Sequence, residues 1–275
     1  MLRKLALIAG GVFIVAWSLG PIYWAVVLSL VNPSQLVGVA PLIPHPFTLH
    51  YFANLFSGGA TSAAFLQAAL SSIIETVVTT ILVVVFATMA GYAFARYTFP
   101  GSRVMFYGII ATMALPIYAV IIPLYQFMAQ VNLIGSYAGV ITVEVSATLP
   151  LALWLMRSFI YSLPRSLEEA AMIDGATPLI ILRGVLLPLI GPGLASTTIV
   201  VFLMTWGQFL IPLTFAPTAG VQPLTVLIPD FATKYAVNYG LQAAAGLLAV
   251  VPPVAVVIRF NRSLLSGLLT GAVTS

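Results

Sequence analysis

Three acidic residues gather beside a glycine in the stretch "EEAAMIDGA", in a chain that otherwise carries little charge. Glu168, Glu169 and Asp174 are half of its six carboxylate side chains. Carboxylates this close together either take part in acid–base chemistry or hold a helix terminus or a partner. The choice between these roles depends on the solvent around the segment and on the elements that position it.

The composition indicates that the solvent is largely lipid. Of 275 residues, 61% are hydrophobic and 6% are charged, and the mean hydropathy is +1.12. An ordinary soluble domain is about 25% charged. The chain has no cysteine, which excludes disulfides, thiolate nucleophiles and cysteine metal ligands. We therefore expect an all-α integral membrane protein.

Apolar runs predict six transmembrane helices, over residues 5–30, 64–95, 104–129, 138–156, 191–213 and about 237–258. The first run follows Arg3 and Lys4, as a signal peptide would, but it exceeds the roughly 7 to 15 residues of a signal-peptide core. It is expected to remain as an anchor. Residues 1–275 are then expected to form a single transmembrane permease domain.

The cations predict the orientation of these spans. Nine of the ten fall on one side of the membrane if six spans alternate: Arg3, Lys4, Arg96, Arg103, Arg157, Arg165, Arg183, Arg259 and Arg262. Lys234 falls on the other side. By the positive-inside rule both termini are cytoplasmic, as are the loop 157–190 and the tail 259–275. The expected location is the plasma (inner) membrane, crossed several times.

The acidic stretch lies in this cytoplasmic loop, whose residues predict a helix that ends at a glycine. Ser166 and Glu169 have the spacing of a capping box, in which the serine hydroxyl and the glutamate each satisfy an unpaired backbone amide. Glu168 and Glu169 would also interact favourably with the helix dipole. The helix is expected from Leu167 to about Asp174, and Gly175 can adopt the left-handed conformation that ends it.

A second short helix is expected directly afterwards. Thr177 and Pro178 have the types of a cap and a first helical residue, and this helix should stop before Pro188. The loop could be an ordinary solvated connection whose acids cap a helix. Ala170 and Ala171 favour another role, because small side chains beside an acid suit a helix that sits in a partner's groove.

In this loop the chain resembles the inner-membrane permease subunits of binding-protein-dependent ABC importers. Their signature is Glu-Ala-Ala, three residues, Gly, nine residues, then an aliphatic residue, any residue, Leu and Pro. The matching positions are Glu169, Ala170, Ala171, Gly175, Val185, Leu187 and Pro188. "GYAFARYTFPG", "LPIYAVIIPLY" and "GLLTGAVTS" are similar to the carbohydrate-uptake branch, in particular to its maltose-type six-span subunit.

The resemblance implies a function and a set of partners. The chain would be a permease subunit of an ATP-driven importer of a sugar or related polar solute, delivered by an external binding protein. A homologous permease subunit and two ATP-binding subunits would complete the complex. The loop, with Glu168, Glu169, Asp174 and Leu187, would dock on an ATP-binding subunit. This chain would bind no cofactor, since ATP and Mg²⁺ would sit in those partners.

Two further regions are candidates for function. The tail from Ser263 to Ser275, with Gly267 and Gly271, is uncharged and rich in small residues, which suits insertion between the ATPase subunits. Three residues are candidates for the translocation pathway, Glu144, Trp206 and Gln208. Glu144 lies about 20 Å from Arg157 along a helix, within the hydrocarbon, so either pathway lining or an interhelical hydrogen bond would explain it. Glu75 is expected near the outer interface, where water can solvate it.

Other classes of protein fit less well. A Walker A loop needs Gly-Lys, whereas Lys4 and Lys234 follow Arg3 and Thr233, so the ATPase must be a separate subunit. An intramembrane serine protease needs a nucleophile beside a base, but the two histidines share one outer loop and no Gly-x-Ser-x-Gly occurs. A non-sugar importer, or a stand-alone secondary transporter with internal repeats, remains an alternative.

Overall fold

A computed structural model describes residues 2–35, 41–217, 220–231 and 238–272 of the chain. These residues form helices, turns and irregular segments, without a strand among them. They belong to two compact units, residues 1–70 with 223–252 and residues 71–222 with 253–275. The all-α prediction is confirmed, whereas a single transmembrane domain over 1–275 stays a prediction.

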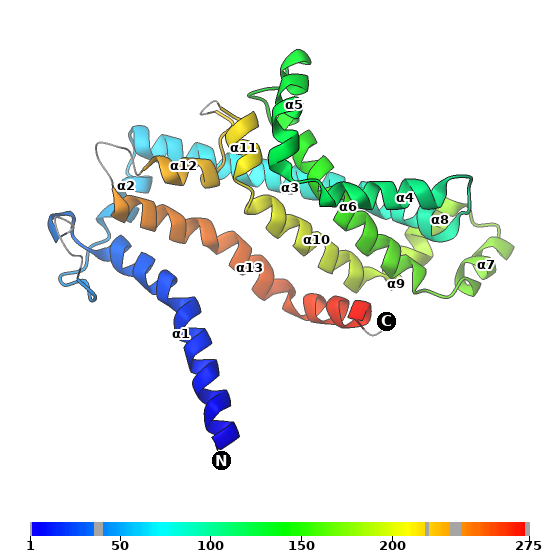
Figure 1. The fold of residues 1–275 in the computed structure, drawn as a ribbon, viewed down its shortest axis with the longest axis horizontal. Helices are drawn as coiled ribbons and strands as arrows, with labels where there is room; N and C mark the ends of the chain where they lie inside the picture. The colour runs from blue at the N-terminus through cyan, green and yellow to red at the C-terminus, as the bar shows by residue number, and fades with distance from the viewer. Residues whose placement is uncertain (1, 36–40, 218–219, 232–237, 273–275) are drawn as a thin grey trace. The chain divides into compact units, whose positions relative to one another are not determined.

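The helices are coloured in chain order in Figure 1. Their bounds are α1 Leu2–Leu30, η1 Pro33–Gln35, α2 His50–Phe56, α3 Ala60–Arg96, α4 Ser102–Ala111, η2 Thr112–Ala114, α5 Ile117–Gln130, α6 Tyr137–Tyr161, α7 Ser166–Ile173, α8 Pro178–Ile181, η3 Leu182–Leu186, α9 Leu187–Leu189, α10 Gly191–Trp206, α11 Leu210–Phe215, α12 Leu224–Asp230 and α13 Tyr239–Ala272. Within the described residues, four helices are long and apolar enough to cross a membrane, or up to six if each of two bent pairs is one span.

Both bends lie next to prolines, the first inside the predicted third span and the second just before the predicted fifth span. The helical segments 102–114 and 117–130 meet at 104°. Leu115 there is extended, as expected for a residue before a proline, and Pro116 is the N-cap residue of α5. The segments 178–189 and 191–206 meet at 84°, just before Pro192. The predicted fifth span, 191–213, is also interrupted, because α10 ends at Trp206 and α11 begins at Leu210.

In the unit of residues 71–222, α3 and α6 pack side by side and run in the same direction. The Ser71 and Tyr137 hydroxyls lie 2.9 Å apart near one end, and the Arg157 Nε donates to the Phe94 carbonyl oxygen at 3.4 Å near the other. The helices come close at Gly91, where a β-carbon would lie 3.0 Å from the backbone nitrogen of Arg157. Glycine is therefore needed for this close contact.

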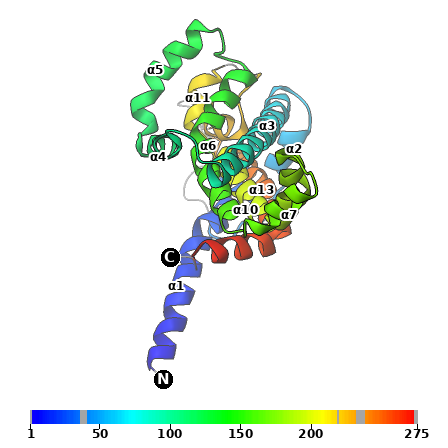
Figure 2. The same cartoon turned by 90° about the vertical axis from the view of Figure 1, so that its right-hand side faces the viewer.

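α6 also packs against α10 and α11, which lie beside it in both views of the chain (Figure 1 and Figure 2). The contacts at the two ends of α6 show that they run in the opposite direction. Phe159, near the end of α6, covers Gly193 at the start of α10. At the other end of α6, the Gly135 amide donates to the Phe215 carbonyl oxygen of α11 at 2.8 Å. The core of this unit therefore consists of α3, α6 and α10, and it positions the segment that connects α6 to α10.

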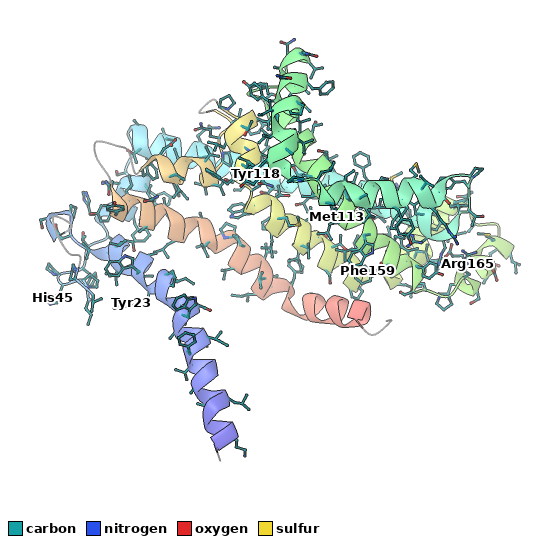
Figure 3. The ribbon with its side chains drawn as sticks, viewed as in Figure 1. Tyr23, His45, Met113, Tyr118, Phe159 and Arg165 are labelled. Atoms are coloured by element: carbon teal, nitrogen blue, oxygen red, sulfur yellow. The ribbon has the colours of Figure 1, made fainter. Side chains whose placement is uncertain are left out.

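The other unit contains α1, α2, α12 and the first turns of α13. The Tyr51 ring of α2 lies against Gly240 at the start of α13, and burial raises the pKa of the Tyr51 hydroxyl. Tyr23 of α1, labelled in Figure 3, donates to the Leu42 carbonyl oxygen at 2.7 Å. Most apolar side chains of α1 are exposed in this chain, as expected for a helix that faces lipid or another subunit.

The predicted tail, residues 259–275, is helical over most of its length, and its cytoplasmic location stays a prediction. α13 continues as a helix through Ala272, so that the backbone of Gly267 and Gly271 is helical. The last three residues of the predicted tail lie outside the described residues. Residues 263–272 contain four leucines and Ala272, which favour a helix, beside serine, threonine and glycine residues, which do not.

Candidate functional site

The predicted coupling loop consists of α7, α8, η3 and α9, and its first helix starts one residue earlier than predicted. α7 begins at Ser166 itself, and its N-cap residue is Arg165. The Arg165 side chain makes no capping hydrogen bond to the backbone amides of α7. The capping box of Ser166 and Glu169 was therefore a wrong prediction. The reason is local, because the Arg165 carbonyl oxygen accepts from the Glu169 amide at 3.1 Å, the amide that the serine would have capped.

The end of α7 matches the prediction. Gly175 has a φ of +82°, in the left-handed region. Its amide donates to the Met172 carbonyl oxygen, and the Ala176 amide donates to that of Ala171, both at 3.0 Å. These two bonds are those of a Schellman motif, which satisfies the last carbonyl groups of a helix. The glycine therefore fixes the direction in which the chain leaves α7.

The second helix starts at Pro178 as predicted, but it does not stop before Pro188. α8 is followed by the π-helical turn η3, in which the Leu187 amide donates to the carbonyl oxygen five residues earlier, that of Leu182. α9 then continues through Pro188. The wider turn accommodates the proline, which has no amide hydrogen and would clash with the preceding turn of a regular α-helix.

The loop rests on an apolar cluster that belongs to the chain itself. Ile181, Leu182 and Leu186 are buried against Met156 and Ile160 of α6. Ala171 and Ala176 are half-buried against the same cluster. The two alanines of the motif therefore have different environments, because Ala170 is exposed and Ala171 packs inwards. Glu169 and Asp174 are also exposed.

The two adjacent glutamates point in different directions. Glu168 is buried and forms an ion pair with Arg96 at the end of α3, whereas Glu169 faces solvent. Sequence reasoning had placed both in contact with a partner. It missed Arg96, which lies 72 residues earlier in the chain, and no local spacing rule links positions that far apart. Arg165, labelled in Figure 3, is exposed beside this pair.

The loop also exposes apolar side chains that were not among the residues predicted for the site. Ile173 is 87% exposed, and Met172, Leu179 and Ile180 are more than half exposed. Exposed apolar groups of this kind mark surfaces that bind another protein or a membrane. The signal in the sequence was the presence of these four apolar residues in a segment outside the predicted spans. They add a second candidate for partner contact next to Glu169 and Ala170.

The acids inside the spans lie at the contact of α3 and α6. Glu144 is 1% exposed, and its Oε2 accepts a hydrogen bond of 3.0 Å from the Thr79 hydroxyl. The interhelical hydrogen bond, one of its two alternatives, is therefore present, and the pathway role stays a prediction. The expectation that water solvates Glu75 was wrong in this structure, because Glu75 is 2% exposed. One oxygen of each carboxylate lacks a hydrogen-bond partner among the described residues.

Trp206 and Gln208 flank the break between α10 and α11. The Trp206 ring stacks on that of Phe202, with 5.8 Å between their centroids. The Gln208 Oε1 accepts from the Phe209 amide at 3.2 Å. Both side chains are half-buried, and their part in a pathway stays a prediction. The described residues contain no group of three or more His, Asp or Glu side chains placed to hold a metal ion.

The fold and the loop define a multi-span membrane protein that presents a helix–glycine–helix segment on its surface. The chain belongs to the family described as binding-protein-dependent transport system inner membrane component, whose model matches residues 84–268. The matched range includes α6, the loop and α10. The chain is accordingly a permease subunit of an ABC importer and not an enzyme, and the family predicted from the Glu-Ala-Ala signature is confirmed.

Individual relatives cover almost the whole chain. The chain is 32% identical over 262 residues to the trehalose transport system permease protein SugB of Mycobacterium tuberculosis, with 94% of each chain covered. It is 28% identical over 274 residues to the trehalose/maltose transport system permease protein MalG of Thermococcus litoralis, with 99% and 97% covered. Its fold is similar to a bacterial ABC transporter involved in the import of the acidic polysaccharide alginate, with a TM-score of 0.80, 21% identity and 95% of each chain covered.

Proposed function

We propose that the chain forms half of the membrane channel of an ATP-driven importer for a sugar or a related polar solute. The observation that carries the proposal is the nearly full-length similarity to permeases named for trehalose and maltose transport. An external binding protein delivers the solute, in keeping with the name of the family. The homologous membrane subunit forms the other half of the channel.

The proposed topology has six spans with both termini in the cytoplasm. Its support is the direction of the helices, because α3 and α6 run parallel and α10 runs antiparallel to α6. Two parallel spans need an odd number of crossings between them, which the bent pair α4 and α5 supplies as one span. This orientation puts the loop 157–190 on the cytoplasmic side together with most of the cations.

The loop is proposed to dock on one of two ATP-binding subunits, which hold ATP and Mg²⁺. Glu169, Ala170, Asp174 and the exposed Ile173 supply the contact surface. ATP binding favours the closed pair of these subunits, and their closure displaces the docked loop. Since the loop is packed on the ends of α6 and α10, its displacement shifts the equilibrium between two orientations of the spans.

The substrate pathway is proposed to include Glu144, Trp206 and Gln208. An acid and an amide can hydrogen-bond sugar hydroxyls, and an indole can stack on the apolar face of a sugar ring. The proposal requires that water reach Glu144 in one state of the cycle, by separation of α3 and α6 or through the facing subunit. The helical tail with Gly267 and Gly271 is proposed to contact the ATP-binding subunits.

Reconstitution tests the function directly. The tagged chain, purified with its partner subunits, is placed in liposomes with the associated binding protein, ATP and a panel of labelled disaccharides. We expect uptake of at least one disaccharide that depends on ATP, on the binding protein and on this chain. Uptake of an amino acid but no sugar would point to a non-sugar importer. Solute uptake by the chain alone, without ATP, would contradict the proposal.

A further inference from the structure

A buried ion pair joins the end of α3 to the first turn of α7. The Arg96 Nε donates to the Glu168 Oε1, and each of the two side chains is 6% exposed. The Arg96 Nη2 also donates to the Leu163 carbonyl oxygen at 3.0 Å. A single guanidinium group therefore holds both the turn between α6 and α7 and the first turn of α7 itself.

The two halves of the loop are fastened in different ways. The second half, from Ile181 to Leu186, is held by apolar burial in the cluster under the loop. In α7 the buried residue is Glu168, and Ala171 is half-buried, while the other six residues are exposed. The attachment of α7 to the rest of the unit therefore depends mainly on the ion pair, since a single methyl group contributes little apolar contact.

The ion pair stabilises the attachment of α7 only while both charged partners are present. A guanidinium group presents several donors in a fixed plane, so it can serve a carboxylate and a carbonyl group at the same time. Removing either charged partner leaves the other buried and unpaired, which is strongly unfavourable. The Arg96 side chain also extends from the last residue of α3, so the link connects α7 to the end of a long, continuous helix.

We infer that Arg96 and Glu168 are positioning residues that make α7 move together with α3. A displacement of α7 is then passed to the second predicted span as well as to α6 and α10. The inference rests on the proposed function, in which α7 docks on an ATP-binding subunit. It also assigns different tasks to neighbouring acids, with Glu168 facing the chain's own α3 and Glu169 left for the partner.

A distance measurement tests the link itself. The chain has no cysteine, so Met89→Cys on α3 and Ser166→Cys at the start of α7, outside the proposed docking surface, can carry spin labels at two exposed positions. In the purified complex we expect a narrow distance distribution. Arg96→Met or Glu168→Ala should broaden it clearly, because α7 loses its attachment. Arg103→Gln, which changes an exposed arginine of α4, is the matched control and should leave the distribution unchanged.

Solute uptake tests the consequence for transport. Uptake is measured per assembled complex, so that a loss of folded protein does not count as a loss of coupling. We expect Arg96→Met and Glu168→Ala each to lower this quantity roughly tenfold while ATP hydrolysis continues. The double variant should be no worse than either single variant, because both changes break one link. Glu168→Gln, which keeps the shape of the side chain, provides a variant that folds if the others do not.

The outcomes separate this inference from the proposed function. The inferred link would be overturned if the single variants kept the wild-type distance distribution or the wild-type uptake per complex. The proposed importer function would still stand in that case. Additive losses in the double variant would also overturn it, since they would show two independent roles. If the wild-type complex transports no solute, the proposed function fails, and the distance measurement still decides whether the ion pair holds α7 on α3.

Discussion

Phe159 of α6, labelled in Figure 3, covers Gly193 of α10 so closely that a β-carbon at position 193 would lie 2.5 Å from the ring. Real β-carbons do not approach other atoms to that distance, so the two helices can pack this way with glycine and not with alanine. The contact lies where the loop enters α10, and it therefore sets how the loop is connected to the spans.

The first prediction follows from this contact. Gly193→Ala should destabilise the chain by about 1–3 kcal/mol, because the Phe159 ring must move out of a packed position. Thermal unfolding of the purified chain in detergent measures the effect. Gly108→Ala is the control, since nothing lies within 4 Å of its β-carbon position, and alanine favours a helix. Equal stability of the two variants would contradict the close contact.

The second prediction concerns the turn at Gly175. Gly175→Val should cost about 1–2 kcal/mol at the end of α7, because a β-branched residue disfavours a positive φ. The second helix of the loop would then be misdirected, and uptake should fall while membrane insertion persists. The assay compares uptake with ATP hydrolysis in the assembled complex. Normal coupling between the two in Gly175→Val would show that the turn is not required.

The third prediction concerns the Thr79–Glu144 hydrogen bond. Glu144→Leu should lower the stability of the chain by about 1–3 kcal/mol, since it leaves the Thr79 hydroxyl without its partner in a buried place. Glu144→Gln keeps an acceptor oxygen and should have nearly wild-type stability in the same unfolding assay. The proposed pathway role adds a separate expectation, that uptake by Glu144→Gln falls although its stability does not. Normal uptake by that variant would leave Glu144 a structural residue.

The fourth prediction concerns the exposed apolar surface of the loop. Ile173→Ser should weaken association with the ATP-binding subunits about tenfold, as expected for a central apolar contact. The folding of the chain itself should be unaffected, because Ile173 is 87% exposed. Co-purification at increasing dilution measures the association. Trp154→Phe, at an exposed position of α6 within the predicted fourth span, serves as the control. Unchanged association would remove Ile173 from the docking surface.

The fifth prediction concerns the end of α13. Deleting residues 267–275 should weaken ATPase association or coupling if this segment contacts the partner subunits. The deletion starts within the helical segment and removes about one and a half turns. The readout is ATP hydrolysis stimulated by the solute-loaded binding protein, with uptake measured in parallel. A truncated chain that transports at the full rate would show that the segment is dispensable.

The sequence predicted the helices well and their interruptions less well. Lipid-facing helices are continuous apolar runs, so α3, α6 and the start of α13 could be placed from composition alone. Proline signals bends only statistically, and whether Pro116 bends a span depends on what packs around it. The same holds for Pro188, which the π-helical turn accommodates.

The loop shows where local rules fail. Gly175 was predictable because its left-handed turn is a property of the backbone at one position. Ser166 was not, because a backbone carbonyl group took the amide that its hydroxyl was expected to cap. The burial of Glu168 depends on Arg96, a partner far away in the sequence. Long-range pairs of this kind require the tertiary structure, since no periodicity in the sequence encodes them.

The π-helical turn between Leu182 and Leu186 gives a reason for the fixed spacing between Gly175 and Pro188. A π turn holds about one residue more than an α turn, because its hydrogen bond spans five residues instead of four. Removing a residue from this segment would convert the wide turn into a regular α turn, in which the Pro188 ring would clash with the preceding turn. The number of residues in this segment must therefore be kept. Residue types can be exchanged at exposed positions such as Gly184, whereas an insertion or deletion is not tolerated.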